Sequence, residues 1–106
     1  MRTWITLIGT IALGLGASLA AQADPVADMA KAGCNACHTL DKKLVGPAYK
    51  EIAAKYKGQA GAVDSLTAKA RAGGKGVWGQ IPMPPNPPAK IGDAELKASV
   101  EWILKQ

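Results

Sequence analysis

The chain has 106 residues with a formal net charge of +5, and this length allows one domain. With 48% hydrophobic and 20% charged residues, the composition is not that of a disordered chain. Two Cys and one His exclude a framework of several disulfides, a four-cysteine zinc site and any site that needs two histidines. Aromatic residues make up only 5% and Phe is absent, so the side chains alone supply little bulk for a core.

The N-terminal segment, residues 1–23, has the three parts of a cleaved secretory signal peptide. Arg2 is followed by an uncharged apolar run over residues 4–20, and Ala21-Gln22-Ala23 is a small-residue cleavage site. The run is at the short end of what spans a bilayer, so we expect removal of the signal, a periplasmic protein and no lasting membrane insertion. An uncleaved signal that tethers the protein is the alternative. The mature domain then covers residues 24–106.

In the mature chain, apolar residues recur at helical spacing, and no segment alternates apolar and polar residues as a strand would. A first short helix is expected over residues 26–32, with Pro25 in its first turn and Gly33 as its stop. Apolar residues then recur at helical spacing over residues 49–56 and 63–70, each segment followed by glycine. A last helix opens at Gly92-Asp93, with Asp93 as the expected N-cap, and reaches residue 104. The prediction is an all-α fold of about four short helices.

A long segment between the third and fourth helices, residues 73–90, holds five of the seven prolines. Proline removes a backbone donor and clashes with the preceding turn, so this segment is not helical. Loops of this length are usually functional in small domains. We therefore expect a stiff strap held in one shape.

The motif that indicates chemistry is Cys34-Asn35-Ala36-Cys37-His38, a C-x-x-C-H string. This string is the attachment signal for c-type haem: the two cysteines reach the two vinyl groups, and the histidine points at the iron. The macrocycle would fill the core that the side chains leave empty. A thioredoxin-type redox pair lacks its βαβ context, a structural disulfide leaves His38 unexplained, and another metal site lacks further Cys or His ligands.

The second axial ligand of the iron has two methionine candidates in the mature chain. Met29 lies on the same short helix as the motif and is too near along the chain, so we expect it in the core. Met83 lies between Pro82 and Pro84 in the strap, and we expect His38 and Met83 to be the metal ligands. Such ligation fills both axial positions and raises the reduction potential. The chain would then carry one electron and not be an enzyme; a haem enzyme or gas sensor with a displaceable sixth ligand is the alternative.

Four segments carry a resemblance to the class I c-type cytochromes, and in particular to the bacterial cytochrome c-551 group, also called cytochrome c8. They are the motif with Gly33 before it, Val-Gly-Pro-Ala-Tyr-Lys at residues 45–50, Gly-Val-Trp-Gly at 76–79 and Ile-Pro-Met-Pro-Pro-Asn at 81–86. The resemblance implies one covalently bound haem c, wrapped by a fold in which the first and last helices cross. It also implies periplasmic electron shuttling from a membrane quinol-oxidising complex to terminal reductases such as nitrite reductase or an oxidase.

The resemblance also implies cofactor-binding roles for single residues. The backbone carbonyl of Pro47 would accept a hydrogen bond from the His38 ring, and the Trp78 indole would donate to a haem propionate. The Asn86 amide would help orient the Met83 sulfur. Lys69 falls where relatives can place an arginine near a propionate, and residues 87–92 look a few residues longer than in the shortest relatives.

The excess positive charge is spread along the chain, which together with export argues against nucleic acid as a partner. We expect redox partner proteins with acidic docking surfaces, met by Lys42-Lys43, Lys75 and Lys90 around the haem edge. An ordinary solvated surface is the alternative for these lysines. No helix face is left over for a second copy, so a monomer is expected.

Overall fold

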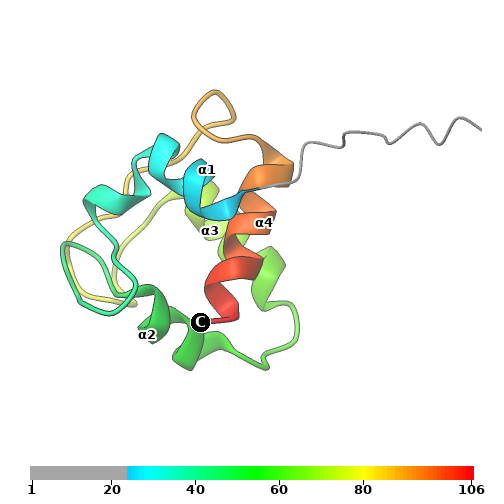
Figure 1. Ribbon diagram of the computed structural model, residues 1–106. Helices are drawn as coiled ribbons and strands as arrows, with labels where there is room; N and C mark the ends of the chain where they lie inside the picture. The colour runs from blue at the N-terminus through cyan, green and yellow to red at the C-terminus, as the bar shows by residue number, and fades with distance from the viewer. Residues whose placement is uncertain (1–23) are drawn as a thin grey trace, which may run out of the picture.

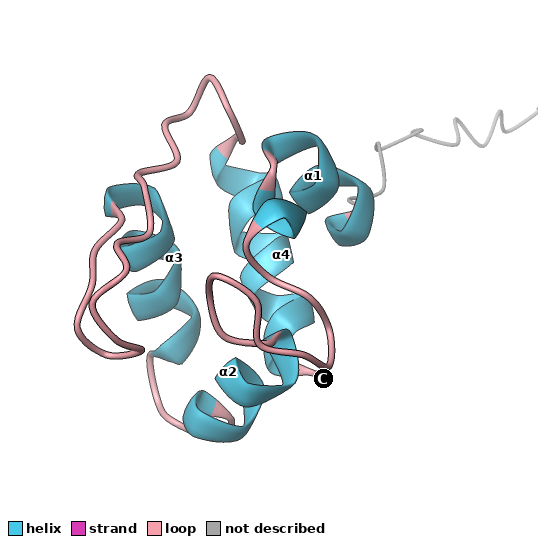
Figure 2. Cartoon of the chain, turned by 90° about the vertical axis from the view of Figure 1, so that its left-hand side faces the viewer, coloured by secondary structure: helices cyan, strands magenta, loops and turns pink. Residues whose placement is uncertain are grey.

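The structure, a computed structural model, describes residues 24–106; the expected signal peptide, residues 1–23, lies outside the described residues. Four α-helices follow one another: α1 (Pro25–Ala32), α2 (Tyr49–Tyr56), α3 (Ala62–Ala72) and α4 (Asp93–Leu104). A single turn of 3₁₀ helix, η1 (Cys34–Ala36), follows α1 and was not predicted. Over residues 24–106 there is no strand, and two isolated bridges are the only β-type pairing (Figure 2). The all-α prediction is confirmed.

Local capping explains where α1 begins and ends. The Asp24 carboxylate accepts a hydrogen bond from the Ala27 N–H at 3.1 Å, and Pro25 occupies the first helical position. Gly33 ends the helix with a positive φ of 85°, a conformation that glycine adopts without penalty. The prediction for this helix was right within a residue, although it overlooked Asp24 as the cap.

One predicted cap was wrong. Gly92 is the N-cap of α4, and Asp93 is the first residue of the helix itself. The Asp93 carboxylate turns instead to the guanidinium of Arg71 at the end of α3, 2.5 Å away. An ion pair with a cation from another helix has replaced the local capping bond that the sequence suggested.

Helix α4 is the central element, because α1, α2 and α3 all pack against it (Figure 1). The first and last helices are therefore in contact, as predicted. Buried Ala32, Ile91 and Leu96 form the core where α1 meets α4, and Cys34 and Ala70 pack at its edge. None of these side chains is aromatic, which agrees with the low aromatic content. Among the described residues, 24–106, no helix has both the length and the apolar character needed to cross a membrane.

Candidate functional site

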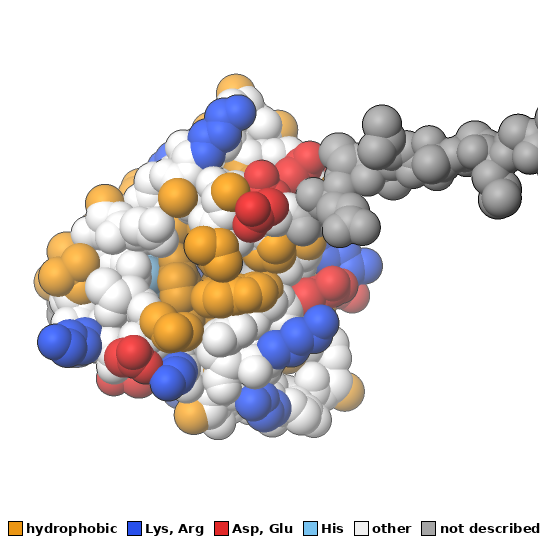
Figure 3. Space-filling model, in the orientation of Figure 1, with side chains coloured by type: hydrophobic (Ala, Val, Ile, Leu, Met, Phe, Trp, Pro, Cys, Tyr) orange, Lys and Arg blue, Asp and Glu red, His pale blue; other side chains and the backbone are white. Residues whose placement is uncertain are grey.

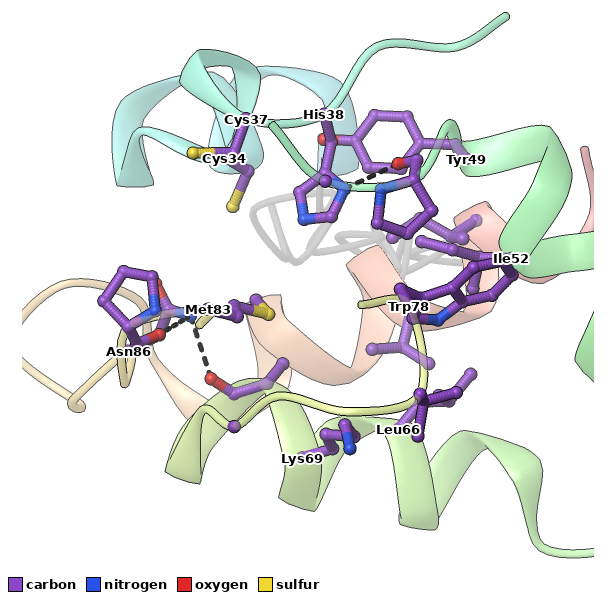
Figure 4. A pocket seen from close by; sticks show the side chains of 18 of the residues that line it. Cys34, Cys37, His38, Tyr49, Ile52, Leu66, Lys69, Trp78, Met83 and Asn86 are labelled. Carbon is purple, nitrogen blue, oxygen red and sulfur yellow. Dashed lines mark hydrogen bonds between the residues drawn. The ribbon is translucent and has the colours of Figure 1, made fainter. Parts of the chain in front are cut away.

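An apolar cavity lies between the segment after η1, α2, α3, the proline-rich strap and α4. Side chains from both long connections and from all four α-helices line it, many of them drawn in Figure 4. Most of the lining is aliphatic or aromatic, and Cys34, Cys37, His38 and Met83 are among its members. The structure thus brings the predicted motif and the predicted strap methionine to one cavity.

His38 is fixed from three sides at one wall of this cavity. Its ring Nδ1–H donates to the backbone carbonyl of Pro47 at 2.7 Å, which is the hydrogen bond that the resemblance implied. The Tyr49 ring stacks on the imidazole, with centroids 5.6 Å apart and planes 20° apart. At Gly46, a Cβ atom would lie 2.6 Å from the imidazole Cε1, so the backbone closes on the ring as only glycine allows. A bond at Nδ1 leaves Nε2 as the free nitrogen for a metal.

The two cysteines lie beside His38 at one edge of the cavity (Figure 4). Both are free and half-buried. Burial raises the pKa of the Cys34 thiol, and the nearby positive charge of Lys90 opposes that shift in part. Two thiols at one edge are what attachment to the two vinyl groups of a porphyrin requires.

Met83 lies across the cavity from His38, as Figure 4 shows. Its backbone pairs in both directions with Gly74: the Met83 N–H donates at 2.8 Å and its carbonyl accepts at 3.0 Å. Gly73 makes this approach possible, because a Cβ there would lie 2.5 Å from the Met83 carbonyl oxygen and φ is +74°. Met29 is 3% exposed and belongs to the core, as predicted.

Asn86 is buried, and its side chain holds the strap to α3. The amide donates to the carbonyl of Ala70 at 2.8 Å and to that of Pro84 at 3.5 Å (Figure 4). Its backbone N–H donates to the carbonyl of Arg71 at 3.1 Å. Asn86 therefore fixes the backbone that carries Met83.

Trp78 and Lys69 line the cavity away from the two cysteines (Figure 4). The Trp78 side chain is 38% exposed, and the Lys55 ammonium lies 5.3 Å from its ring centroid. This is a cation–π contact that holds a positive charge at this side of the cavity. Lys55 was not singled out from the sequence as a site residue, because its neighbour Trp78 is distant along the chain.

The donor set fits a c-type haem. One imidazole nitrogen faces one thioether across the cavity, two thiols lie at its edge, and most of the remaining lining is apolar. Such walls suit a porphyrin ring, and histidine with methionine is the axial pair of electron-transfer cytochromes. Over residues 24–106, no cluster of three or more His, Cys, Asp or Glu side chains is arranged to hold a metal ion by itself.

Comparison with known proteins agrees with this donor set, since the family profile described as Cytochrome c matches residues 23–106. The chain belongs to the cytochrome c family. Cytochrome c-551 of Azotobacter vinelandii is 60% identical over 72 residues, which cover 68% of this chain and 84% of that protein. Cytochrome c-551 of Pseudomonas aeruginosa is 48% identical over 83 residues, which cover 78% of this chain and 77% of that protein.

Among solved structures, that of wild-type Nitrosomonas europaea cytochrome c552 is similar with a TM-score of 0.71 and 48% identity. The match covers 76% of this chain and 96% of that one. The predicted resemblance to the c-551 group is confirmed. As a member of this family, the chain is an electron-transfer protein with covalently bound haem c and its iron, and Cys34 and Cys37 are the cysteines available for attachment.

Proposed function

We propose that the mature protein, residues 24–106, is a periplasmic one-electron carrier whose haem iron is ligated by His38 and Met83. It takes electrons from a membrane quinol-oxidising complex and delivers them to a terminal reductase such as a nitrite reductase or an oxidase. It is not an enzyme, because two protein ligands leave the iron no position for a substrate. The observation that supports this best is the placement of His38 and Met83 on opposite sides of one apolar cavity.

The bound haem supplies a single redox-active iron, and the chain's own residues keep its surroundings constant. The Pro47 carbonyl orients the imidazole and increases its strength as a ligand. The pairing of Met83 with Gly74 and the prolines beside Met83 hold the strap in one shape. A site that changes little between oxidation states needs little reorganisation. We assign Trp78 to a haem propionate, and Asn86 to the orientation of the Met83 strap.

The surface beside the cavity suits brief contact with partners. Val45, Val77 and Ile81 are both exposed and part of the cavity lining. Figure 3 shows hydrophobic side chains gathered on one face, with both basic and acidic side chains around them. We propose that this apolar face meets the partner and that lysines around it, Lys42, Lys43, Lys75 and Lys90, attract an acidic docking surface.

The first experiment is the absorption spectrum of the oxidised and reduced holoprotein. We expect a low-spin c-type spectrum with a weak far-red sulfur-to-iron band that Met83→Ala abolishes. Met29→Leu is the matched control, because it removes the other methionine of the described chain from a core position and leaves the band intact. A high-spin wild-type spectrum that shifts with carbon monoxide would refute the carrier function and favour a sensor or enzyme. The intact mass of the exported protein tests removal of residues 1–23.

Docking is tested by the rate of electron transfer to a carboxylate-rich redox protein as a function of salt. The variant Lys42→Gln with Lys43→Gln should slow the reaction at low salt and have little effect at high salt, because salt screens the attraction. The double variant Lys97→Gln with Lys105→Gln is the control, because it removes the same charge from exposed positions outside the cavity lining. Equal slowing by both variants would show that net charge acts and a defined docking face does not.

A further inference from the structure

The last turn of α3 is completed by residues of the strap. The final carbonyls of a helix have no partner within it and need one from elsewhere. Asn86 supplies two partners, since its side-chain amide donates to the Ala70 carbonyl and its backbone N–H donates to the Arg71 carbonyl. The end of α3 and the strap that carries Met83 are therefore one hydrogen-bonded unit.

The side chain of Arg71 adds bonds from α3 back to the strap and onward to the start of α4. One guanidinium nitrogen, Nη1, donates to the Asn86 carbonyl at 2.8 Å and to the Ile91 carbonyl at 2.7 Å. The other, Nη2, donates to the Asp93 carboxylate at 2.5 Å. The Arg71 side chain thus joins Asn86 of the strap, Ile91 in the loop over residues 87–92 and Asp93 at the start of α4.

These three hydrogen bonds of Arg71 differ in how much they contribute to stability. The Asp93 side chain is 93% exposed, and an ion pair to such a group contributes little. Asn86 and Ile91 are buried at 5% and 6% exposure, and the Arg71 side chain is only 23% exposed. Carbonyls that lose a charged donor in such surroundings are costly to leave unpaired. The function of Arg71 is therefore in its bonds to the two backbone carbonyls.

Both ends of the loop over residues 87–92 meet at a single nitrogen of Arg71. This loop is the segment that looks longer than in the shortest relatives, and extra residues next to a ligand strap add slack. Since the guanidinium bonds to both Asn86 and Ile91, it would limit how far motion of the loop reaches Met83. Lysine could not replace this arrangement, because its ammonium is a point charge without the planar fork.

We propose that Arg71 is a positioning residue for the distal ligand: it sets how long Met83 stays in place opposite His38. This inference rests on the proposed ligation by Met83. Without Arg71, the strap should open more often while the rest of the fold stays intact, because α3, α4 and the core keep their own contacts. An external ligand binds iron only in the open state, so its apparent affinity rises in proportion to the fraction of protein that is open.

The test is a titration of the oxidised holoprotein with imidazole, a nitrogen ligand that can bind iron only where Met83 has left. Loss of the far-red band reports binding. For Arg71→Gln we expect the apparent affinity for imidazole to rise about tenfold, as removal of a charged hydrogen-bond donor from buried carbonyls predicts. Arg71→Lys should give a smaller rise. The control is Ala53→Gly, which weakens buried α2 by helix propensity but leaves the strap untouched.

A second readout is independent of the haem. Amide hydrogen exchange at Asn86 and Met83 should speed up in Arg71→Gln, while amides within α2 stay protected as in the wild type. The inference is overturned if Arg71→Gln and Ala53→Gly raise imidazole affinity equally, or if neither does. Absence of the band in the wild type, or its persistence in Met83→Ala, would instead overturn the proposed ligation itself.

Discussion

Replacing Gly46 by alanine tests whether the backbone beside His38 sets the position of the imidazole. The new Cβ would lie 2.6 Å from Cε1 and 3.0 Å from Nδ1, whereas ordinary contact begins at 3.4 Å. The ring must therefore move by about 0.8 Å at that atom. Gly46 does not have a positive φ, so the backbone itself tolerates alanine and the contact alone is tested. The Nδ1 atom of the same ring makes the 2.7 Å hydrogen bond to the Pro47 carbonyl, so a shift of the ring disturbs that bond.

The cost of this substitution has two parts. Overpacking in a well-filled site costs about 1–3 kcal/mol. A lost or lengthened hydrogen bond adds about 1 kcal/mol. We expect Gly46→Ala to lower the free energy of unfolding by about 2–4 kcal/mol in a urea titration of the oxidised holoprotein. A weaker bond to Pro47 makes the imidazole a poorer electron donor, so the reduction potential should rise.

The matched control is Gly92→Ala. Its φ of −69° suits alanine, and the atoms that a Cβ would meet all belong to the Glu95 carboxylate, which can swing away. It should change stability by less than about 0.5 kcal/mol. Equal unfolding free energies for Gly46→Ala and wild type, with an unshifted potential, would refute the argument that the backbone at this position holds the ring.

Three further changes have defined outcomes. Asn86→Ala should lower stability by about 1–3 kcal/mol in denaturant titrations, because the Ala70 carbonyl loses its donor; an unchanged midpoint would contradict this. Burial raises the pKa of Tyr49 from its usual value of 10 to about 12. Between these values the folded state keeps a proton that the unfolded state loses, so stability should fall with rising pH by up to about 1.4 kcal/mol per pH unit. Tyr49→Phe should remove that component, and parallel pH profiles of the two proteins would refute it. Lys50→Gln should cost no more than about 0.5 kcal/mol, because both members of its 2.7 Å pair with Asp41 are exposed; a larger loss in thermal unfolding would contradict that reading.

The helices could be predicted from the sequence because their signals are local. Gly33 lies within a residue or two of the helix it ends, and the apolar spacing of α2 and α4 repeats every three or four residues. The error at Asp93 has the opposite origin. A capping preference is local, but the guanidinium that attracts this carboxylate comes from α3, 22 positions away along the chain.

The site divides in the same way. The C-x-x-C-H string and Met83 between prolines are short motifs, and they identified the cysteines, the histidine and the candidate distal ligand. The ring of Tyr49 against His38 and the charge of Lys55 over Trp78 depend on how distant segments fold together. The contacts of Arg71 could not be predicted either, because in the sequence it is an ordinary basic residue in the last turn of a helix. Contacts of this kind have no signature in a single sequence.

The pairing of α1 with α4 places the two ends of the domain in contact, and this affects the order of events during biogenesis. Because α4 follows α1 along the chain, this contact cannot form before α4 has been synthesised. Closing so long a loop also costs entropy, although each doubling of length adds only about 0.6 kcal/mol. Cys34 and Cys37 follow α1 directly and become half-buried once the helices meet. Since Cys34 packs against the core cluster that includes Leu96 of α4, we expect the thiols to be more accessible to an incoming porphyrin before α4 docks.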